Sequence, residues 1–274
     1  MAAIDLLLSS ATVNHYGLNR AFELARQLGL DGIELYVDER ADTRQLDYIR
    51  RLMEDCFIRV PVVHAPRPGA RYPAADGTWD LRLQFARDLA AALGAGLVVT
   101  HPPQYDEAAG DPAGLQFAAG VPVAIELMSR QTRSFCGFTF TRRRWRRGLP
   151  RDWSALPAVV FDTTHVGSWS PDLVTAWREQ APRVKHIHLS NLDGRAWHLP
   201  PQLGRLPLRE FLAAVVDTRY RGTISLELAP HTIGGYELTR VAATLAESVT
   251  FVRTALVQAF AARQRSRAES GGGR

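Results

Sequence analysis

The sequence predicts a single-domain (β/α)8 TIM barrel, and three observations support this fold class. The chain has 274 residues, and barrels of this type typically have about 250 residues in one unit. Short β-type runs alternate with segments of helical periodicity almost throughout. The number of strand candidates is eight, which is the number that closes a parallel barrel.

Eight short apolar runs have the length of buried strands. They are Ile4–Ser9, Gly32–Val37, Arg59–His64, Gly96–Thr100, Pro122–Leu127, Ala158–Asp162, Val184–Leu189 and Thr223–Leu228. A doubly wound sheet is the alternative, but it would usually carry a glycine-rich phosphate loop after the first strand. The segment after the first run reads SSATVNHYG and has no GxGxxG motif, which favours the barrel.

Apolar residues at three- and four-residue spacing predict helices between these strands. The expected helices are Leu18–Leu28, Thr43–Asp55, Leu81–Leu93, Pro171–Gln180 and Leu206–Thr218, with a long closing helix at Leu238–Phe260. Roughly twenty residues join the fourth and fifth strands and contain at most a short helix. The next connection, SRQTRSFCGFTFTRRRWRRGLPRDWS, is expected to be a long irregular loop. The predicted barrel occupies residues 1–258, and residues 259–274 are expected to form a flexible basic tail.

The composition is that of a globular protein, with 46% hydrophobic and 22% charged residues. The first residues lack a basic leader and a hydrophobic stretch of signal length, and no run approaches about 18 apolar residues. We therefore expect a cytoplasmic protein with no membrane partner.

Cys56 and Cys136 have no metal-binding or disulfide spacing. Lys185, the only lysine, lies at the start of the seventh strand, away from the expected active face, which argues against Schiff-base chemistry.

The net charge of +5 is concentrated in two segments. The expected tail contains four arginines and one glutamate, which leaves 29 basic and 27 acidic residues in the rest of the chain. The second segment, TRRRWRRGLPR, holds six arginines between Arg142 and Arg151. This local basicity weakens the case for a nucleic-acid-binding protein. The arginine cluster around Trp145 is compatible with a solvated loop, a grip on a sugar phosphate or contacts to a nucleic-acid backbone.

Six consecutive predicted strands, the third to the eighth, end in a carboxylate or an imidazole. The residues are His64, His101, Glu126, Asp162 with His165, His188 and Glu227. Each one alone could be a solvated loop residue or a satisfied core residue. The carboxyl ends of the strands form the active face of such barrels, so six in succession indicate one shared polar site.

Four of these side chains come from the fifth to eighth strands and have the chemistry of a metal site. Glu126, Asp162, His188 and Glu227 would supply four ligands and leave positions for substrate or water. Mixed carboxylate and imidazole ligands suit Mn²⁺, Mg²⁺, Co²⁺ or Zn²⁺.

Seven motifs carry a family resemblance over roughly residues 4 to 258. They are GLDGIEL, VHAP, IELM, FDTTHVG, KHIHLSN, HLPPQLG and RGTISLEL. In order and spacing the chain resembles the xylose isomerase-like superfamily. Its best-known branches are sugar or sugar-phosphate isomerases and epimerases, and zinc-dependent AP endonucleases.

The resemblance implies roles for individual residues. Glu126, Asp162, His188 and Glu227 are similar to the single-metal ligands of the epimerases, so one divalent ion and no organic cofactor are expected. Arg195 resembles the arginine that grips a substrate oxygen. The remaining expected substrate contacts are His64, His101, His165 and His198.

Four further residues lie outside this set. His186 has the parity of His188 but lies one layer deeper, so we interpret it as structural. Glu34, on the second strand, is a candidate for a group that supports the ligands from behind. His15 and His231 are interpreted as loop residues without a role.

The favoured hypothesis is a sugar or sugar-phosphate isomerase or epimerase. One of Glu126 and Glu227 would remove the proton beside the carbonyl, and the other would return a proton to the resulting enediolate. A hydride shift is also compatible with these residues. The expected partner is a small sugar or sugar phosphate, and the resemblance leaves a homo-oligomer open.

Two alternatives belong to other classes. An AP endonuclease-like phosphodiesterase would use His64, His101, His165 and His198 as further zinc ligands. Against it, Ala196 stands where that branch carries an acidic ligand, and HLPPQLG lacks an acidic residue, with Arg205 nearby instead. The other alternative is a barrel that binds a metabolite without catalysis.

Overall fold

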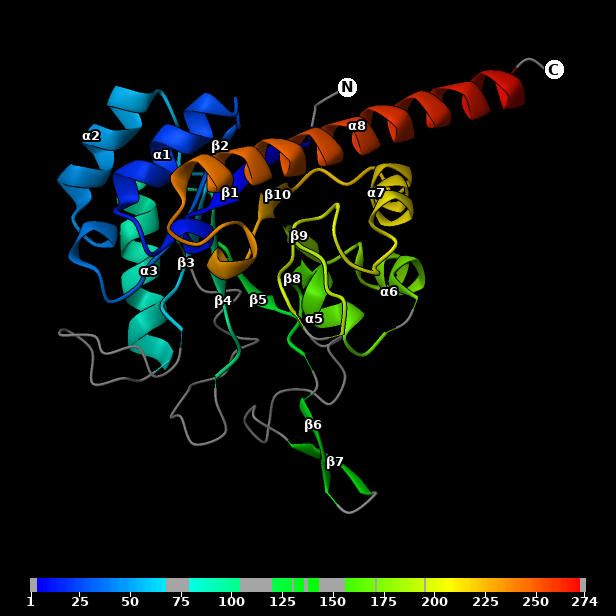
Figure 1. The fold of residues 1–274 in the computed structure, drawn as a ribbon, viewed down its shortest axis with the longest axis horizontal. Helices are drawn as coiled ribbons and strands as arrows, with labels where there is room; N and C mark the ends of the chain where they lie inside the picture. Colours follow the sequence, from blue (N-terminus) through cyan, green and yellow to red (C-terminus); the bar gives the residue numbers. More distant parts are fainter. Residues whose placement is uncertain are drawn as a thin grey trace.

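The chain folds into a closed parallel barrel, which confirms the predicted fold class. The computed structural model describes residues 4–67, 79–103, 120–129, 131–135, 138–142, 156–170, 172–194 and 196–271. Eight strands close the barrel in the order β1-β10-β9-β8-β5-β4-β3-β2, and every neighbouring pair is parallel (Figure 1). The first and last strands pair with each other, so the two ends of the chain close one sheet.

Each of the eight predicted runs contains one barrel strand. The strands are β1 (Asp5–Ser9), β2 (Gly32–Tyr36), β3 (Val62–His64), β4 (Leu97–Thr100), β5 (Val123–Glu126), β8 (Val159–Asp162), β9 (Val184–Leu189) and β10 (Thr223–Leu226). They are shorter than the predicted runs by up to three residues, except β9, whose bounds agree with the prediction.

Side chains alternate between the barrel interior and the surrounding helices, as the period of a strand requires. On β9, Ile187 and Leu189 point outward into the main apolar core, whereas His186 and His188 point inward. A small separate core fills part of the interior, formed by Leu7, Val62, Leu97, Val99, Ala124 and Val160. The polar interior residues lie next to this apolar plug.

The pairing of β8 with β9 contains a register shift that places the polar side chains opposite each other. Val159 pairs with Val184, but the next residue, Val160, pairs with His186. The extra residue on β9 leaves Lys185 exposed and brings Asp162 opposite His188. Such a bulge re-aims side chains without breaking the sheet.

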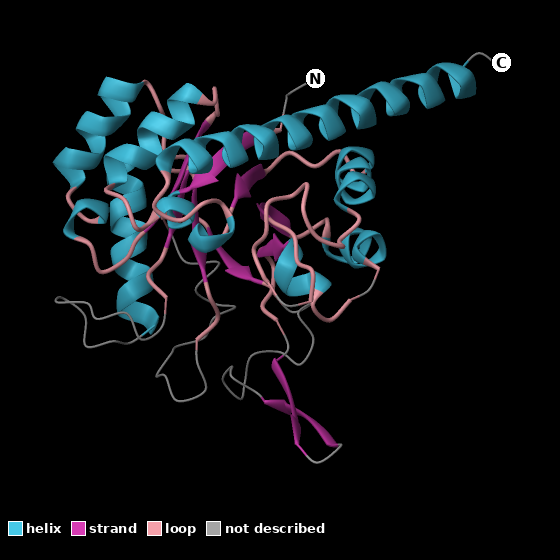
Figure 2. Cartoon of the chain, viewed as in Figure 1, coloured by secondary structure: helices cyan, strands magenta, loops and turns pink. Residues whose placement is uncertain are grey.

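Helices cover the outside of the barrel (Figure 2). They are α1 (Leu18–Gln27), α2 (Leu46–Cys56), α3 (Trp79–Leu93), α5 (Thr163–Gly167), α6 (Leu173–Gln180), α7 (Leu208–Asp217) and α8 (Leu238–Gly271). All six predicted helices are present, and the short helix α5 is an addition. Every helix within the described residues is too short or too polar to span a lipid bilayer.

Helix α8 differs from the expected tail. It continues past residue 258 to Gly271, where we expected a flexible segment, and projects beyond α7 (Figure 1). The physical reason is composition, because the segment AFAARQRSRAES consists largely of Ala and Arg, which favour helix. Arg263 also donates a hydrogen bond of 2.7 Å to the Val216 carbonyl of α7.

The connection after β5 differs from the irregular loop that we expected. It contains an antiparallel hairpin of β6 (Gln131–Phe135) and β7 (Phe138–Arg142), which lies apart from the barrel strands in Figure 1. Alternating Thr and Phe in FTFT favour a strand. Of the arginine cluster, only the backbone of Arg142 is described, and residues 143–151, including Trp145, lie outside the described residues.

We predict that Trp177→Ala lowers the free energy of unfolding by about 3–5 kcal/mol, the usual cost of removing a large buried aromatic ring. Trp177 of α6 is buried, and its ring contacts Phe161, Phe211 and Tyr220, which joins α6 and α7 to β8. Its Nε1 donates to the Ala214 carbonyl at 3.2 Å. Urea denaturation followed by circular dichroism measures the change.

The control for this prediction is Val257→Ala, at a side chain that is 67% exposed. We expect it to change stability by no more than about 0.5 kcal/mol. Equal midpoints for the two variants would show that the aromatic cluster does not hold these elements together.

Candidate metal centre

Four side chains from consecutive barrel strands meet at the carboxyl end of the barrel. Glu126 ends β5, Asp162 ends β8, His188 lies near the end of β9, and Glu227 follows β10. Each of them offers one ligand atom, and these four atoms all lie within 4.8 Å of one another. The structure therefore brings together the four residues that the sequence analysis grouped as metal ligands.

Asp162 has two oxygens with different surroundings. Its Oδ1 accepts a hydrogen bond of 2.6 Å from the backbone N–H of His165, so it caps the N-terminus of α5. Its Oδ2 is buried, makes no hydrogen bond among the described residues, and lies 3.8 Å from His188 Nδ1. The cap thus fixes the carboxylate with its second oxygen turned toward the other ligands.

His188 is the centre of the group. Its Nδ1 lies 2.9 Å from Glu227 Oε2 and 3.6 Å from Glu126 Oε1, while its Nε2 lies 2.9 Å from Glu34 Oε1. The contact between Nδ1 and Glu227 Oε2 has the length of a hydrogen bond but not its alignment. That is the arrangement expected of ligand atoms that converge on a common point instead of on one another.

Glu126 also contacts three imidazoles outside the quartet. Its Oε2 lies 3.1 Å from His101 Nε2 and 3.8 Å from His64 Nε2, and its Oε1 lies 3.4 Å from His165 Nε2. His64 Nδ1 donates to the Ala65 carbonyl at 2.8 Å, which leaves its Nε2 directed at Glu126 without an aligned partner. His64, His101 and Glu126 form a second group whose ligand atoms lie within 4.8 Å of each other.

The charges of the quartet are strongly coupled. Burial alone would raise the pKa of Glu227, but His188 outweighs burial and lowers it to about 2. Burial would also raise the pKa of Glu126, but the contacts with His101 and His188 together outweigh burial and lower it. Burial raises the pKa of Asp162, with Glu126 and Glu227 adding to the effect. Burial would lower the pKa of His188, yet Glu227 and Glu34 raise it well above its ordinary value.

These observations fit a divalent cation. Three acidic side chains and one imidazole surround one point, and buried atoms of Glu126, Asp162 and His188 lack an aligned hydrogen-bond partner within the described part of the chain. A buried polar atom without a partner costs about 1–3 kcal/mol, and a bound ion would satisfy several such atoms at once. The carboxylate-rich donor set suits Mn²⁺, Mg²⁺, Co²⁺ or Zn²⁺.

The loop after β9 brings His198 to the same face. Asn191 organises this loop, because its Oδ1 accepts from the backbone N–H groups of Leu192 and Leu206 and its Nδ2 donates to the Pro201 carbonyl. His198 has a left-handed backbone with φ 53°, and its carbonyl accepts from Ala229 at 2.8 Å.

The side chain of His198 joins a third group of possible ligands. Its ligand atom lies within 4.8 Å of those of Asp162 and His165, and its Nδ1 lies 3.2 Å from Ser190 Oγ. The five histidines expected at the site, His188 included, thus lie on one face. Arg195, the other expected substrate contact, lies outside the described residues.

A pocket of about 540 Å³ opens beside the quartet. Glu126, Glu227, His101, His165 and His198 line it, together with residues that the sequence analysis did not single out: Ala11, Asn14, Tyr36, Asp38, Glu39, Arg40, Arg67, Leu228, Ala229 and Pro230. The position of Tyr36 could have been predicted from the strand period, because Tyr36 follows Glu34 by two residues on β2 and so faces the same side. The others lie on loops or in short 3-10 helices, whose path no periodicity reveals.

The two histidines interpreted as loop residues without a role are not among the described lining residues. His15 lies in a turn, where its Nε2 contacts the Gly235 carbonyl at 2.6 Å. His231 is exposed in the 3-10 helix η4 (Pro230–Thr232).

The comparison with protein families identifies the barrel. The family described as xylose isomerase-like TIM barrel matches residues 22–254. The chain belongs to this family. A Mycobacterium tuberculosis (strain H37Rv) protein named uncharacterized protein Rv0498 is 30% identical over 279 residues, covering 93% of this chain and 99% of the relative. Its name states no activity.

Several solved structures share the fold. An L-ribulose 3-epimerase superposes with a TM-score of 0.67 at 15% identity, covering 99% of both chains. A D-psicose 3-epimerase from Clostridium cellulolyticum H10 gives 0.64 at 16% identity, covering 92% of this chain and 99% of the other. A family 2 AP endonuclease from Brucella melitensis gives 0.60 at 15% identity, covering 85% and 97%. At these identities the likeness shows the fold alone.

We predict that Mn²⁺ stabilises the protein through the quartet. At a free concentration of 100 times the dissociation constant, a ligand that binds only the folded state adds about 2.7 kcal/mol. Differential scanning calorimetry should show a higher Tm with Mn²⁺ than with a chelator. Asp162→Asn should abolish most of this rise, because asparagine can still cap α5 but removes the charge of the second oxygen.

The matched control is Glu54→Gln, which neutralises an exposed carboxylate on α2. This variant should keep the full rise in Tm. If Asp162→Asn keeps it as well, Mn²⁺ binds somewhere else.

Proposed function

We propose that this protein is a divalent-metal-dependent sugar or sugar-phosphate isomerase or epimerase, and that Glu126, Asp162, His188 and Glu227 hold the ion. The observation that carries the proposal is the convergence of these four side chains at the mouth of the barrel. In barrels of this class the reaction takes place at this face. The cytoplasmic location and a homo-oligomeric state remain predictions.

The pocket supports a small-molecule substrate. Its volume of about 540 Å³ falls within the range of roughly 300–1,000 Å³ that is usual for small-ligand sites. The polar side chains of His101, His165 and His198 border it, and they would orient the hydroxyl groups of a sugar. Arg40 and Arg67 lie on the lining as well, where a phosphate or a hydroxyl group would find donors.

Glu126 and Glu227 are the proposed proton-transfer pair. A bound divalent ion would supply Lewis acidity, which lowers the cost of removing a proton beside a carbonyl by several kcal/mol. One glutamate would accept that proton, and the other would return a proton to the opposite face or to the neighbouring carbon. Both carboxylates are held ionised by nearby histidines. Each would therefore be a modest base, suited to a C–H bond that is already acidified.

We predict that the protein exchanges the C–H proton beside the carbonyl of a ketose with solvent. The assay incubates enzyme and Mn²⁺ in D₂O with D-psicose, D-fructose, D-tagatose or L-ribulose, or with their phosphates, and follows deuterium incorporation and epimer formation by NMR. Glu126→Gln and Glu227→Gln should each reduce exchange by about 10²–10⁴-fold, the usual contribution of a positioned acid or base.

Glu54→Gln is again the control and should exchange at the wild-type rate. A glutamine variant that keeps full exchange has lost no proton-transfer group, which would remove that glutamate from the proposed pair. Product formation without deuterium would replace proton transfer by a hydride shift. Absence of turnover on every sugar would favour the metabolite-binding barrel.

One observation favours a second candidate, an AP endonuclease-like phosphodiesterase. His64, His101 and Glu126 could hold another ion beside the first, and Asp162, His165 and His198 form a further group. Neighbouring ions can clamp the attacking and leaving oxygens of a phosphodiester. Against this candidate, Ala196 supplies no ligand two residues before His198, where the branch carries an acidic one.

We expect one tightly bound divalent ion per chain and no incision of an oligonucleotide duplex that contains a single abasic site. Metal analysis after gel filtration and an incision assay with Zn²⁺ measure both quantities. The same duplex without the abasic site is the control. Two or three ions per chain together with site-specific incision would establish the phosphodiesterase instead.

A further inference from the structure

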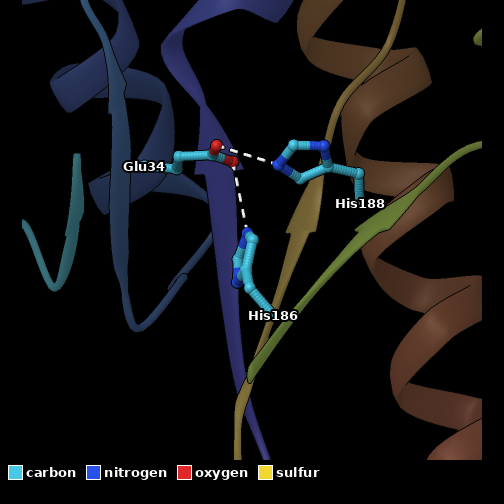
Figure 3. Close-up of side chains that lie close together, drawn as sticks. All are labelled: Glu34, His186 and His188. Carbon is cyan, nitrogen blue, oxygen red and sulfur yellow. Dashed lines mark hydrogen bonds and ion pairs between the residues drawn. The ribbon is translucent and has the colours of Figure 1, made fainter. Parts of the chain in front are cut away.

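A buried chain of polar groups lies behind the quartet, on the side away from the pocket. Glu34 of β2 lies between two histidines of β9, as Figure 3 shows. Its Oε1 lies 2.9 Å from His188 Nε2, and its Oε2 lies 3.4 Å from His186 Nε2. His186 Nδ1 in turn lies 2.6 Å from the hydroxyl of Thr223 on β10. Glu34, His186 and His188 are fully buried.

The chemistry of these buried groups fixes the direction of each hydrogen bond between them. An ionised carboxylate only accepts, so both Nε2 atoms must carry the hydrogen that faces Glu34. In the neutral imidazole, His186 Nδ1 then accepts the hydrogen of Thr223 Oγ1. The corresponding atom of His188, Nδ1, is directed at Glu126, Asp162 and Glu227. Glu34 thereby determines which nitrogen of His188 can act as a ligand.

Glu34 occupies a buried position at which an apolar side chain would cost less free energy to bury. The neighbouring interior residues form the apolar plug that includes Leu7 and Val62, and a buried carboxylate costs several kcal/mol unless it is paired. Two imidazoles pair with this one carboxylate, and they outweigh burial so that its pKa is lowered. The edge of the His186 ring packs against His188, with the ring centroids 5.1 Å apart, and its contacts with Glu34 and Thr223 hold the carboxylate in place.

We propose that Glu34, held by His186, is the positioning residue of the metal site: it fixes the ring orientation and the tautomer of His188 so that Nδ1 faces the quartet. The proposal rests on the proposed function, in that the quartet holds a divalent ion. A carboxylate behind a ligating histidine typically changes metal affinity by about 10–100-fold. Glu34 is not among the described residues that line the pocket, and it contacts His188 directly, so its effect acts through His188.

The test is the affinity of the purified protein for Co²⁺, measured by isothermal titration, together with the visible absorption spectrum of the Co²⁺-loaded protein. We expect Glu34→Ala to weaken Co²⁺ binding by about 10–100-fold and to shift the ligand-field bands, because His188 is free to turn. Glu34→Gln should weaken binding less than Glu34→Ala does, because the remaining amide oxygen can still accept a hydrogen bond from one of the two histidines. It also preserves the shape of the side chain, so it carries the test if Glu34→Ala does not fold.

Ser9→Ala is the matched control for a change inside the barrel. Ser9 is the cross-strand neighbour of Glu34, and its buried hydroxyl makes no hydrogen bond among the described residues. This variant should keep the wild-type affinity and spectrum. Wild-type affinity and spectrum in both Glu34 variants would overturn the inference. A wild-type protein that binds no Co²⁺ at the quartet would instead overturn the proposed function, so the two failures are distinguishable.

Discussion

The structure depends on how the protein accommodates three acidic side chains at one buried point. Two like charges about 4 Å apart repel each other by about 4 kcal/mol at an effective dielectric constant of 20, and Glu126, Asp162 and Glu227 place their ligand atoms within 4.8 Å of one another. His188 is the single imidazole inside that group; burial would lower its pKa, but the negative charges of Glu227 and Glu34 raise it. A divalent cation would neutralise the same field, which is why we regard the quartet as the functional centre.

The barrel provides the rigidity that such a charge cluster requires. The four side chains come from strands whose outward residues, including Ile125, Phe161 and Ile187, are buried in the apolar core beneath the helices. The inward residues therefore cannot separate unless the core moves with them. Around the quartet, the N-cap of α5 fixes Asp162, the shifted register of β9 places His188 opposite it, and Glu34 restrains the far side of the His188 ring. These restraints explain how several charged groups remain together in a largely buried site.

Much of this arrangement was predictable from the sequence because strands and barrel ends follow simple rules. The alternation of apolar runs with helical periodicity gave all eight strands, and the carboxyl-end rule brought Glu126, Asp162, His188 and Glu227 to one face. Helix α5 was not predicted, since five residues are too few for a helical period. The hairpin of β6 and β7 lies where the sequence predicts a loop, and α8 extends past the residue where the apolar pattern ends. Arg40 and Asn14 reach the pocket from loops, whose course depends on tertiary contacts.

Anomalous diffraction from crystals soaked with Zn²⁺ would show whether the quartet is one coordination site. We predict an anomalous peak about 2.0–2.2 Å from His188 Nδ1 and from carboxylate oxygens of Glu126, Asp162 and Glu227, which is the usual range of zinc–ligand distances. Crystals with saturating Zn²⁺ and no peak among these four side chains would contradict it.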